Sequence, residues 1–402
     1  MKNPYQLVTN SLAGQGPVGS SSVFPPAACE AAHEEISSWP KYTPTPLVSL
    51  SGLARANSLA QVWYKDEAHR FGLGSFKALG GAYALFRLLQ KEIAERTGTV
   101  PTSDELRNGT FKAITKDITV TTATDGNHGR SVAWGAKQFH CRCVIYVPRQ
   151  CSQNRQLAIE KYGAEVKRCT VGYDRTVRRC NEEAGRNGWL VVSDTSWDGY
   201  EEIPAIVMQG YTVMIAELRA QMGSASPPTH VFVQGGVGGL AAAVCAGFRN
   251  LWGAQSPQII VVEPSGAACL FASAVSEKPT PAPGKVHTIM AGLDCGRVSP
   301  VAWRVLSQGA QFFMTVPDSV VSHCMRLLAS SPYGDPRVVA GESAIAGLAG
   351  LLHVVKDEQA RRQLGLSPES RILLLGTEGA TDPHVYKQLI ASNGKTARRR
   401  IT

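Results

Sequence analysis

The chain has 402 residues, of which 44% are hydrophobic and 18% are charged, and its formal net charge at pH 7 is +9. These values are ordinary for a globular protein with two or more hydrophobic cores, and the 39 glycines and 23 prolines follow no repeat, which excludes collagen-like and low-complexity chains. No apolar run is long enough to predict a membrane span, and the basic C-terminal stretch "KTARRRIT" is too small a footprint to predict nucleic-acid binding.

The predicted elements indicate an α/β protein. Residues 1–40 are rich in Gly, Ser, Pro and Ala and predict an extended or loosely packed arm. Short aliphatic and β-branched runs then alternate with helical patterns, such as those of 82–97 and 240–254, and this alternation predicts largely parallel sheets. The predicted strands are 117–124, 141–148, 189–194, 230–236, 258–264 and 371–379.

The glycine-rich stretch "FGLGSFKALGG" (71–81) contains a single lysine, Lys77, and lacks the residue order of a P-loop. Ser75 is a good N-cap for the helix that follows. Few polar residues flank Lys77 in the sequence, which predicts a desolvated amine that loses its proton easily and attacks aldehydes.

The ten cysteines form no Cys-x-x-Cys pair, and no histidine cluster accompanies them, so we predict no metal site. Scattered cysteines and the absence of a recognisable secretory signal predict a reduced, cytoplasmic protein with buried thiols. The spacing of Cys269 and Cys295 does not by itself establish a disulfide.

The stretch "VFVQGGVGGLAAAV" (231–244) runs from a strand through glycines into a helix. Backbone N–H groups and a helix N-terminus then form an anion site, most simply for a phosphate, although a tight turn without a ligand has the same pattern. The loop also fits the dinucleotide pattern G-x-G-x-x-A at Gly236, Gly238 and Ala241, with Glu263 placed to bind a ribose hydroxyl. A nicotinamide-dependent dehydrogenase is therefore an alternative.

A phosphate loop and a lysine that forms a Schiff base are the two anchors that pyridoxal 5'-phosphate needs. The motifs "SFKALGG", "TDGNHG", "GGVGG" and "GTEG" occur in this order over residues 75–379 and resemble those of the fold-type II pyridoxal-phosphate enzymes, the threonine dehydratase and tryptophan synthase β group. Within it the chain is most similar to the diaminopropionate ammonia-lyase family, through residues 65–81, 123–136, 191–204, 288–296 and 376–383.

The resemblance implies a carbon–nitrogen lyase that converts 2,3-diaminopropionate to pyruvate and two ammonia by α,β-elimination. The alternatives are a serine/threonine dehydratase or another β-eliminase and, in a different class, a non-catalytic binding homologue. The implied fold has two α/β lobes with the cofactor in the cleft between them. The small lobe is an insertion of residues 90–197, the large lobe consists of 1–89 and 198–402, and the enzyme is a homodimer.

The same resemblance implies roles for single residues. Lys77 binds the cofactor covalently and exchanges the α-proton, Phe76 packs near the ring, and Asn127 bonds the phenolic oxygen. Thr377 faces the pyridine nitrogen, with Glu378, Thr381 and Asp382 as rivals. The phosphate amides are those of Gly235, Gly236, Val237, Gly238 and Gly239.

Two aspartates point to a doubly aminated substrate. Threonine dehydratases look like Ser-x-Gly-Asn-His where this chain has an acid, Asp125, at the second position. We expect Asp125 to act as base on one face of the α-carbon and Lys77 on the other, so that both enantiomers react. Asp194 is expected to hold the β-amino group. The plainer alternatives are a turn-forming Asp125 and a strand-capping Asp194, and structural roles are predicted for His128, Glu263 and Glu342.

Overall fold

The computed structural model describes residues 5–15, 20–223 and 225–391. Contacts between Cα atoms divide the chain into two compact units. Unit 1 consists of Met1–Phe24, Pro44–Ser75 and Met214–Thr402, and unit 2 consists of Pro25–Thr43 and Phe76–Val213.

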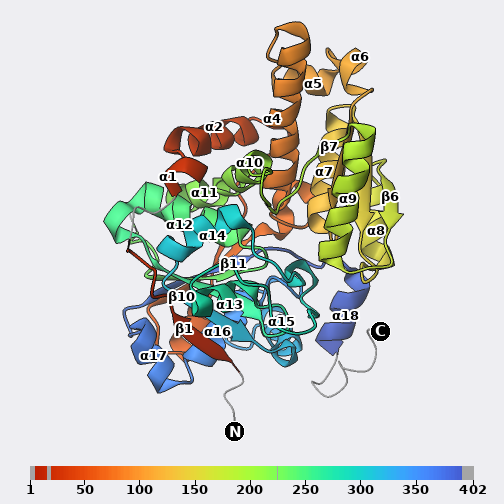
Figure 1. Cartoon of the computed structure of the whole chain (residues 1–402). Helices are drawn as coiled ribbons and strands as arrows, with labels where there is room; N and C mark the ends of the chain where they lie inside the picture. Colours follow the sequence, from red (N-terminus) through yellow and green to blue (C-terminus); the bar gives the residue numbers. More distant parts are fainter. Residues whose placement is uncertain (1–4, 16–19, 224, 392–402) are drawn as a thin grey trace. The chain divides into compact units, whose positions relative to one another are not determined.

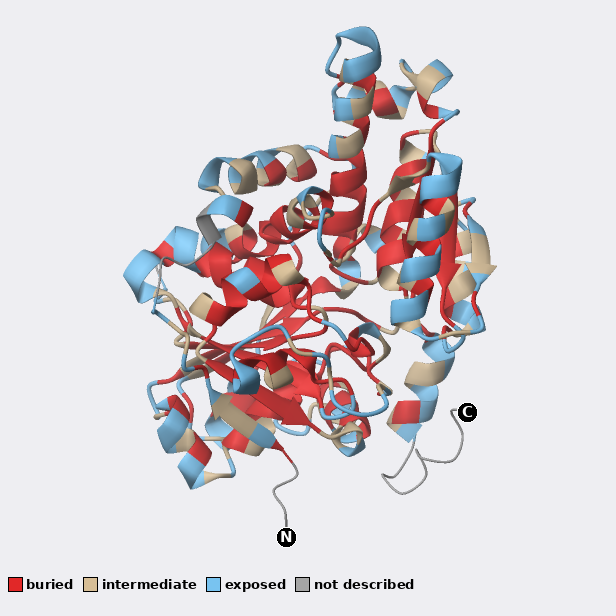
Figure 2. Cartoon of the chain, in the orientation of Figure 1, coloured by how far each residue is buried: buried red, intermediate tan, exposed pale blue. Residues whose placement is uncertain are grey.

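Unit 1 contains a seven-stranded sheet with the order β1-β10-β9-β8-β11-β3-β2 (Figure 1). The five inner strands are parallel, whereas β1 and β2 lie antiparallel at the two edges. Most residues of the inner strands are buried, as Figure 2 shows, which explains the nearly continuous aliphatic sequences of β8, β9 and β11. The strands are β1 (Gln6–Thr9), β2 (Leu47–Ser49), β3 (Gln61–Asp66), β8 (His230–Gln234), β9 (Gln258–Pro264), β10 (Phe312–Val316) and β11 (Arg371–Gly376).

The main core of unit 1 lies where α16 (Ala346–Val354) packs on β8, β9 and β10. Phe232, Ile260 and Met314 come from these strands and belong to one buried cluster. The other helices are α1 (Ser20–Val23), α3 (Ser51–Ala56), η1 (Glu67–Gly72), α11 (Val213–Met222), α12 (Gly239–Trp252), η2 (Gly253–Gln255), α13 (Cys269–Ser276), η3 (Ala291–Leu293), α14 (Pro300–Gly309), η4 (Asp318–Val320), α15 (Val321–Ser330), α17 (Glu358–Leu364) and α18 (Pro383–Ala391).

Unit 2 contains a parallel four-stranded sheet with the order β6-β5-β4-β7 (Figure 1). The strands are β4 (Thr119–Ala123), β5 (Arg142–Val147), β6 (Glu165–Arg168) and β7 (Leu190–Val191). Its helices are α2 (Pro26–Ser37), α4 (Ala78–Thr97), α5 (Ser103–Asn108), α6 (Lys112–Thr115), α7 (Asn127–Gln138), α8 (Gln153–Glu160), α9 (Tyr173–Asn187) and α10 (Glu202–Tyr211).

Unit 2 is larger than the predicted insertion of residues 90–197, because α4 packs closely against both α7 and α10. Small residues allow these contacts. A Cβ atom on Gly210 would lie 2.3 Å from the carbonyl oxygen of Leu79, and one on Gly135 would lie 3.1 Å from the Cβ of Ala82. Residues 76–89 and 198–213 therefore belong to the same compact unit as the predicted insertion.

Each predicted strand contains an observed one, but two local predictions differ from the structure. Within the described part of 1–40, β1 pairs with β10 and α2 buries Ile36, so this segment is not a loosely packed arm. Ser75 does not cap α4, which starts at Ala78 with Lys77 in the N-cap position. Ser75 instead forms a backbone bridge with Glu378.

None of the described helices is both long enough and apolar enough to cross a membrane.

Candidate active site

In unit 2, Lys77 forms an ion pair with Asp194. Lys77 is placed by the start of α4, and Asp194 lies in the loop after β7. The ammonium Nζ donates a hydrogen bond to Asp194 Oδ2 at 2.6 Å, and the two side chains are only 20% and 9% exposed. Two of the three predicted catalytic residues, 117 positions apart in the sequence, thus lie in direct contact.

Two aromatic rings border the amine of Lys77. Its Nζ atom lies 5.0 Å from the ring centroid of Phe76 and 5.5 Å from that of Tyr211, and the two rings pack edge to face at 4.7 Å. Phe76 was predicted to belong to the site. Sequence reasoning missed Tyr211 because it ends α10 inside an apolar helical pattern that carries no catalytic motif.

The charges of the pair oppose the effect of burial. Burial alone lowers the pKa of Lys77, but the Asp194 carboxylate outweighs it and the pKa is raised. The prediction of an easily deprotonated lysine is therefore wrong for this arrangement, because the prediction did not take into account that Asp194, distant in the sequence, lies next to Lys77. Burial likewise raises the pKa of Asp194, whereas His128 and Lys77 lower it, with a net value of about 2. Since burial lowers the pKa of His128, Lys77 supplies the positive charge at neutral pH.

The predicted asparagine turn joins β4 to α7. The Thr124 hydroxyl accepts hydrogen bonds from the backbone amides of Gly126 and Gly129, both at 3.0 Å, and Gly126 has a φ of 144°. The side-chain oxygen of Asn127, the first residue of α7, accepts a hydrogen bond from Arg130 at 2.6 Å. The acceptor side of the Asn127 amide is thus engaged by Arg130, which sequence reasoning did not single out.

His128 and Asp125 lie in the same turn. His128 Nε2 lies 2.8 Å from the carbonyl oxygen of Val192, two residues before Asp194, so His128 ties α7 to the end of the neighbouring strand. This bond supports the structural role predicted for His128. Asp125 is half-buried, and its backbone oxygen is 3.7 Å from the Cys151 thiol.

In unit 1, the predicted phosphate loop connects β8 to α12. Gly235 donates its amide to Val262 at 2.9 Å, and Gly238 donates its amide to Gly235 at 3.2 Å. The remaining amides of the loop, those of Gly236, Val237 and Gly239, are therefore the candidate hydrogen-bond donors to a bound anion. Gly236 and Gly238 have φ values of 65° and 102°, and a Cβ on Gly235 would lie 2.5 Å from Glu263 Cγ. Only glycine suits these positions, so the loop fits a phosphate group.

Glu263 is fully buried beneath this loop. Its carboxylate accepts hydrogen bonds from the backbone amides of Leu270 at 3.0 Å and Phe271 at 2.7 Å, at the start of α13. Burial raises its pKa to about 8 against the effect of these amides. Glu263 therefore has the structural role predicted for it, and the dehydrogenase alternative loses its ribose-binding acid.

Thr377 follows β11 and is 4% exposed. Its rivals are engaged elsewhere. Glu378 accepts hydrogen bonds from the Ser343 amide at 3.1 Å and from the Thr381 hydroxyl at 3.4 Å. Asp382 accepts hydrogen bonds from two amides in the first turn of α18. These bonds favour Thr377 as the residue that faces a ligand.

Cys269 and Cys295 both lie near the glycine loop, and neither is part of a disulfide. The Cys269 thiol donates to the carbonyl oxygen of Gly236 at 3.5 Å, and the Cys295 sulfur is 3.7 Å from the position of a Cβ on Gly236. Their contacts are with the loop that carries the phosphate amides.

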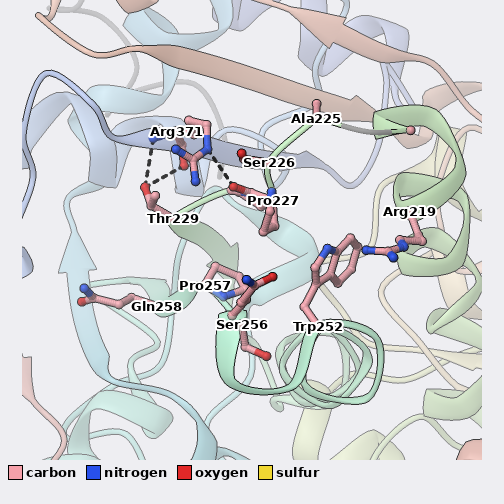
Figure 3. A pocket seen from close by; sticks show the side chains of 13 residues that line it. Arg219, Ala225, Ser226, Pro227, Thr229, Trp252, Ser256, Pro257, Gln258 and Arg371 are labelled. Atoms are coloured by element: carbon pink, nitrogen blue, oxygen red, sulfur yellow. Dashed lines mark hydrogen bonds between the residues drawn. The ribbon is translucent and has the colours of Figure 1, made fainter.

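A separate hollow on unit 1 contains none of the predicted site residues (Figure 3). The guanidinium of Arg219 lies 5.3 Å from the Trp252 ring, and Arg371 donates to the carbonyl oxygen of Pro227 at 2.8 Å. Its arginines are thus engaged with neighbouring groups, and among the described residues that line it there is no carboxylate, lysine, cysteine or histidine. We assign the chemistry to the residues described above.

Comparison with known proteins gives a consistent picture. A family model described as pyridoxal-phosphate dependent enzyme matches residues 39–378. The diaminopropionate ammonia-lyase of Escherichia coli (strain K12) is 40% identical over 355 residues, which are 87% of this chain and 87% of that protein. The solved structure of the holo Escherichia coli enzyme has a TM-score of 0.88, with 35% identity and 96% of each chain covered. Its complex with an aminoacrylate-PLP azomethine reaction intermediate has a TM-score of 0.86 and 35% identity, with 96% of this chain and 97% of that chain covered.

Proposed function

Because the chain belongs to the pyridoxal-phosphate dependent enzymes, and among them to the diaminopropionate ammonia-lyases, we propose that it converts 2,3-diaminopropionate and water to pyruvate and two ammonia. Its cofactor is pyridoxal 5'-phosphate, which when bound supplies an electron sink for the negative charge at the substrate α-carbon. The residues of this chain bind and orient the reactants and move protons.

The ion pair between Lys77 and Asp194 carries this proposal. With a pKa of about 2, Asp194 is ionised at neutral pH, and in this structure it binds an ammonium group. The β-ammonium of diaminopropionate presents the same charge and the same N–H donors. Ammonia leaves readily only when its nitrogen is protonated, and a nearby carboxylate favours that charged form. Asp194 therefore suits both recognition and departure of the β-amino group.

The cofactor contacts follow from the two sets of residues. In unit 2, Lys77 is the covalent anchor and Phe76 packs near the ring. Because Arg130 occupies the oxygen of the Asn127 amide, the NH₂ end is the part of Asn127 that suits the phenolic oxygen of the cofactor. In unit 1, Thr377 faces the pyridine nitrogen, where a neutral hydroxyl leaves the ring less protonated. In the same unit, the phosphate would receive the amides of Gly236, Val237 and Gly239, whereas the predicted amides of Gly235 and Gly238 are bonded to Val262 and Gly235.

Two bases allow both enantiomers to react in this proposal. Lys77 removes the α-proton on one face of the substrate carbon, and Asp125 removes it on the other. The support for Asp125 is its place in the turn beside Asn127, where the dehydratase pattern has no acid.

A substrate panel tests the reaction. Purified holoenzyme should release pyruvate from D- and L-diaminopropionate faster than from serine or threonine, because only diaminopropionate has a second ammonium group for Asp194. The holoenzyme should absorb at about 410 nm, and Lys77→Ala should abolish this band and the turnover. A preference for serine would contradict the proposed substrate, and an unchanged band in Lys77→Ala would contradict the assigned lysine.

We further propose a homodimer in the cytoplasm. The dimer is what the resemblance to fold-type II enzymes implies, and light scattering of the purified protein tests it. The cytoplasmic location is supported by the ten cysteines, all of which lie in the described ranges and none of which is part of a disulfide there.

A further inference from the structure

The hydroxyl of Tyr211 finds no hydrogen-bond partner among the described residues, although the side chain is only 1% exposed. A buried tyrosine hydroxyl normally has a partner, because an unsatisfied polar group is costly inside a protein. A hydroxyl beside a candidate active site that makes no hydrogen bond of standard geometry therefore suggests a partner that is fully engaged in another state of that site.

Tyr211 stands next to the Lys77 amine. Its ring packs against Phe76, and Lys77 Nζ lies 5.5 Å from the ring centroid. Asp194 has the larger effect of the two on the pKa of Lys77, and Tyr211 also raises it, in part as a nearby hydrogen-bonding group, although no hydrogen bond of standard geometry joins the two side chains. His128 acts on Asp194 in turn. Burial raises the pKa of Tyr211, so the phenol is uncharged at neutral pH. An uncharged phenol oxygen is an acceptor for an N–H group of Lys77.

Packing of α10 on α4 holds Tyr211 at this position. A Cβ on Gly80 would lie 2.4 Å from Tyr211 Cε1 and 2.7 Å from Val207 Cγ1. A Cβ on Gly210 would clash in the same way with the backbone of α4. The glycine on each helix lets the aromatic ring reach the end of α4 from which Lys77 projects. The ring is therefore fixed by backbone packing, and its hydroxyl is the part left to interact.

We propose that Tyr211 is a positioning residue for Lys77, whose Nζ donates a hydrogen bond to the Tyr211 hydroxyl when Asp194 binds the β-ammonium of the substrate instead. This inference rests on the proposed function. Lys77 loses its hydrogen bond when Asp194 binds the β-ammonium of the substrate. A Lys77 amine that then rotates freely would be a poor base. A hydrogen bond to Tyr211 uses one N–H group and keeps the lone pair of the neutral amine directed away from Tyr211. The exchange moves no proton and breaks no covalent bond.

The test measures the pKa of Lys77 in the full-length protein freed of cofactor. Competitive acetylation at a series of pH values, read by mass spectrometry of the Lys77 peptide, gives this pKa without substrate or turnover. Tyr211→Phe keeps the ring and removes the acceptor. With Asp194 intact, we expect Tyr211→Phe to lower the pKa of Lys77 only slightly. In the Asp194→Ala background, where Tyr211 is the remaining acceptor of the two, the decrease should be about one unit, a roughly tenfold change.

Tyr83→Phe is the matched control, because Tyr83 is a fully buried tyrosine on α4 whose hydroxyl bonds Arg87. Its substitution should leave the pKa of Lys77 unchanged. An unchanged pKa for Tyr211→Phe in both backgrounds overturns the proposal, as does an equal decrease in Tyr83→Phe. In the holoenzyme, Tyr211→Phe should lower kcat for diaminopropionate about tenfold with little effect on KM. The labelling experiment needs no substrate, so the two failures are distinguishable: a failed substrate panel contradicts the proposed function, and an unchanged Lys77 pKa contradicts the role of Tyr211.

Discussion

Lys77 and Asp194 keep opposite charges 2.6 Å apart, although burial disfavours the charge on each. The depressed pKa of Asp194 means that its contribution to stability is present above its unfolded value and is lost as the pH falls toward about 2. The raised pKa of Lys77 means that its contribution persists below its unfolded value and is lost only at more alkaline pH. Around neutral pH the carboxylate is therefore ready to exchange one ammonium group for another.

Asp125 is the residue on which reaction of both enantiomers depends. Asp125→Asn should lower kcat for one enantiomer of diaminopropionate by about 100-fold or more, the usual contribution of a general base, and affect the other much less. Pyruvate release from each enantiomer measures the difference. Asp198→Asn is a suitable control, since Asp198 is exposed in the same half of the chain. An equal loss for the two enantiomers would show that the two-base hypothesis is wrong.

At the scale of elements, Tyr200 holds the segment that carries Asp194. Its hydroxyl donates to the carbonyl oxygen of Val191 at 2.8 Å and accepts from the amide of Ser193 at 3.1 Å. Within this loop a backbone bridge joins Trp197 to Tyr200, and the ring centroids of these two residues lie 4.2 Å apart in a stacked arrangement. The position of Asp194 therefore depends on a residue that follows it in the chain.

Tyr200→Phe should remove both hydrogen bonds while keeping the ring. Urea unfolding should show a loss of about 1–3 kcal/mol, because the carbonyl of partly buried Val191 and the amide of buried Ser193 lose a partner. If Asp194 recognises the β-ammonium, kcat/KM should fall more for diaminopropionate than for serine. Tyr333→Phe, at an exposed tyrosine, should change neither quantity. A proportional loss for both substrates would argue against this role of Asp194.

At the scale of the whole molecule, one buried acid links the glycine loop of unit 1 to the stability of the fold. The pKa of Glu263 is raised by burial to about 8, well above the value of an exposed glutamate. As the pH rises from about 4.5 to 8, the unfolded chain loses this proton before the folded protein does, so the contribution of Glu263 to stability decreases over that interval.

Glu263→Gln should flatten this pH dependence. The wild-type protein should lose up to about 4 kcal/mol of unfolding free energy between pH 5 and pH 8 through this group, and the variant should lose less over the same range. Its stability at pH 5 should be lower, since an amide oxygen replaces only one of two acceptors. Urea unfolding at both pH values measures the slopes, with Glu95→Gln on the exposed face of α4 as control. Parallel slopes in wild type and Glu263→Gln would contradict the assignment.

The sequence by itself determined the fold class, the cofactor family and the turns that carry Lys77, Asn127 and the phosphate loop. These features depend on local patterns: aliphatic runs make the buried strands β4, β5, β8, β9 and β11, and glycines allow the positive φ values of the loop. The strands β1, β2, β3, β6 and β10 went unpredicted. Short or charged sequences such as "QVWYKD" of β3 become strands only when a neighbouring strand pairs with them.

Only the tertiary structure decided which distant groups meet. It joined Lys77 to Asp194, reversed the expected shift of the lysine's pKa, and placed Tyr211 beside the amine. It also engaged Glu263 in two amide hydrogen bonds that exclude the ribose role. Local sequence does not contain these results, because a pKa depends on the charges that surround a group in space, and packing of small residues such as Gly80 and Gly210 sets those distances.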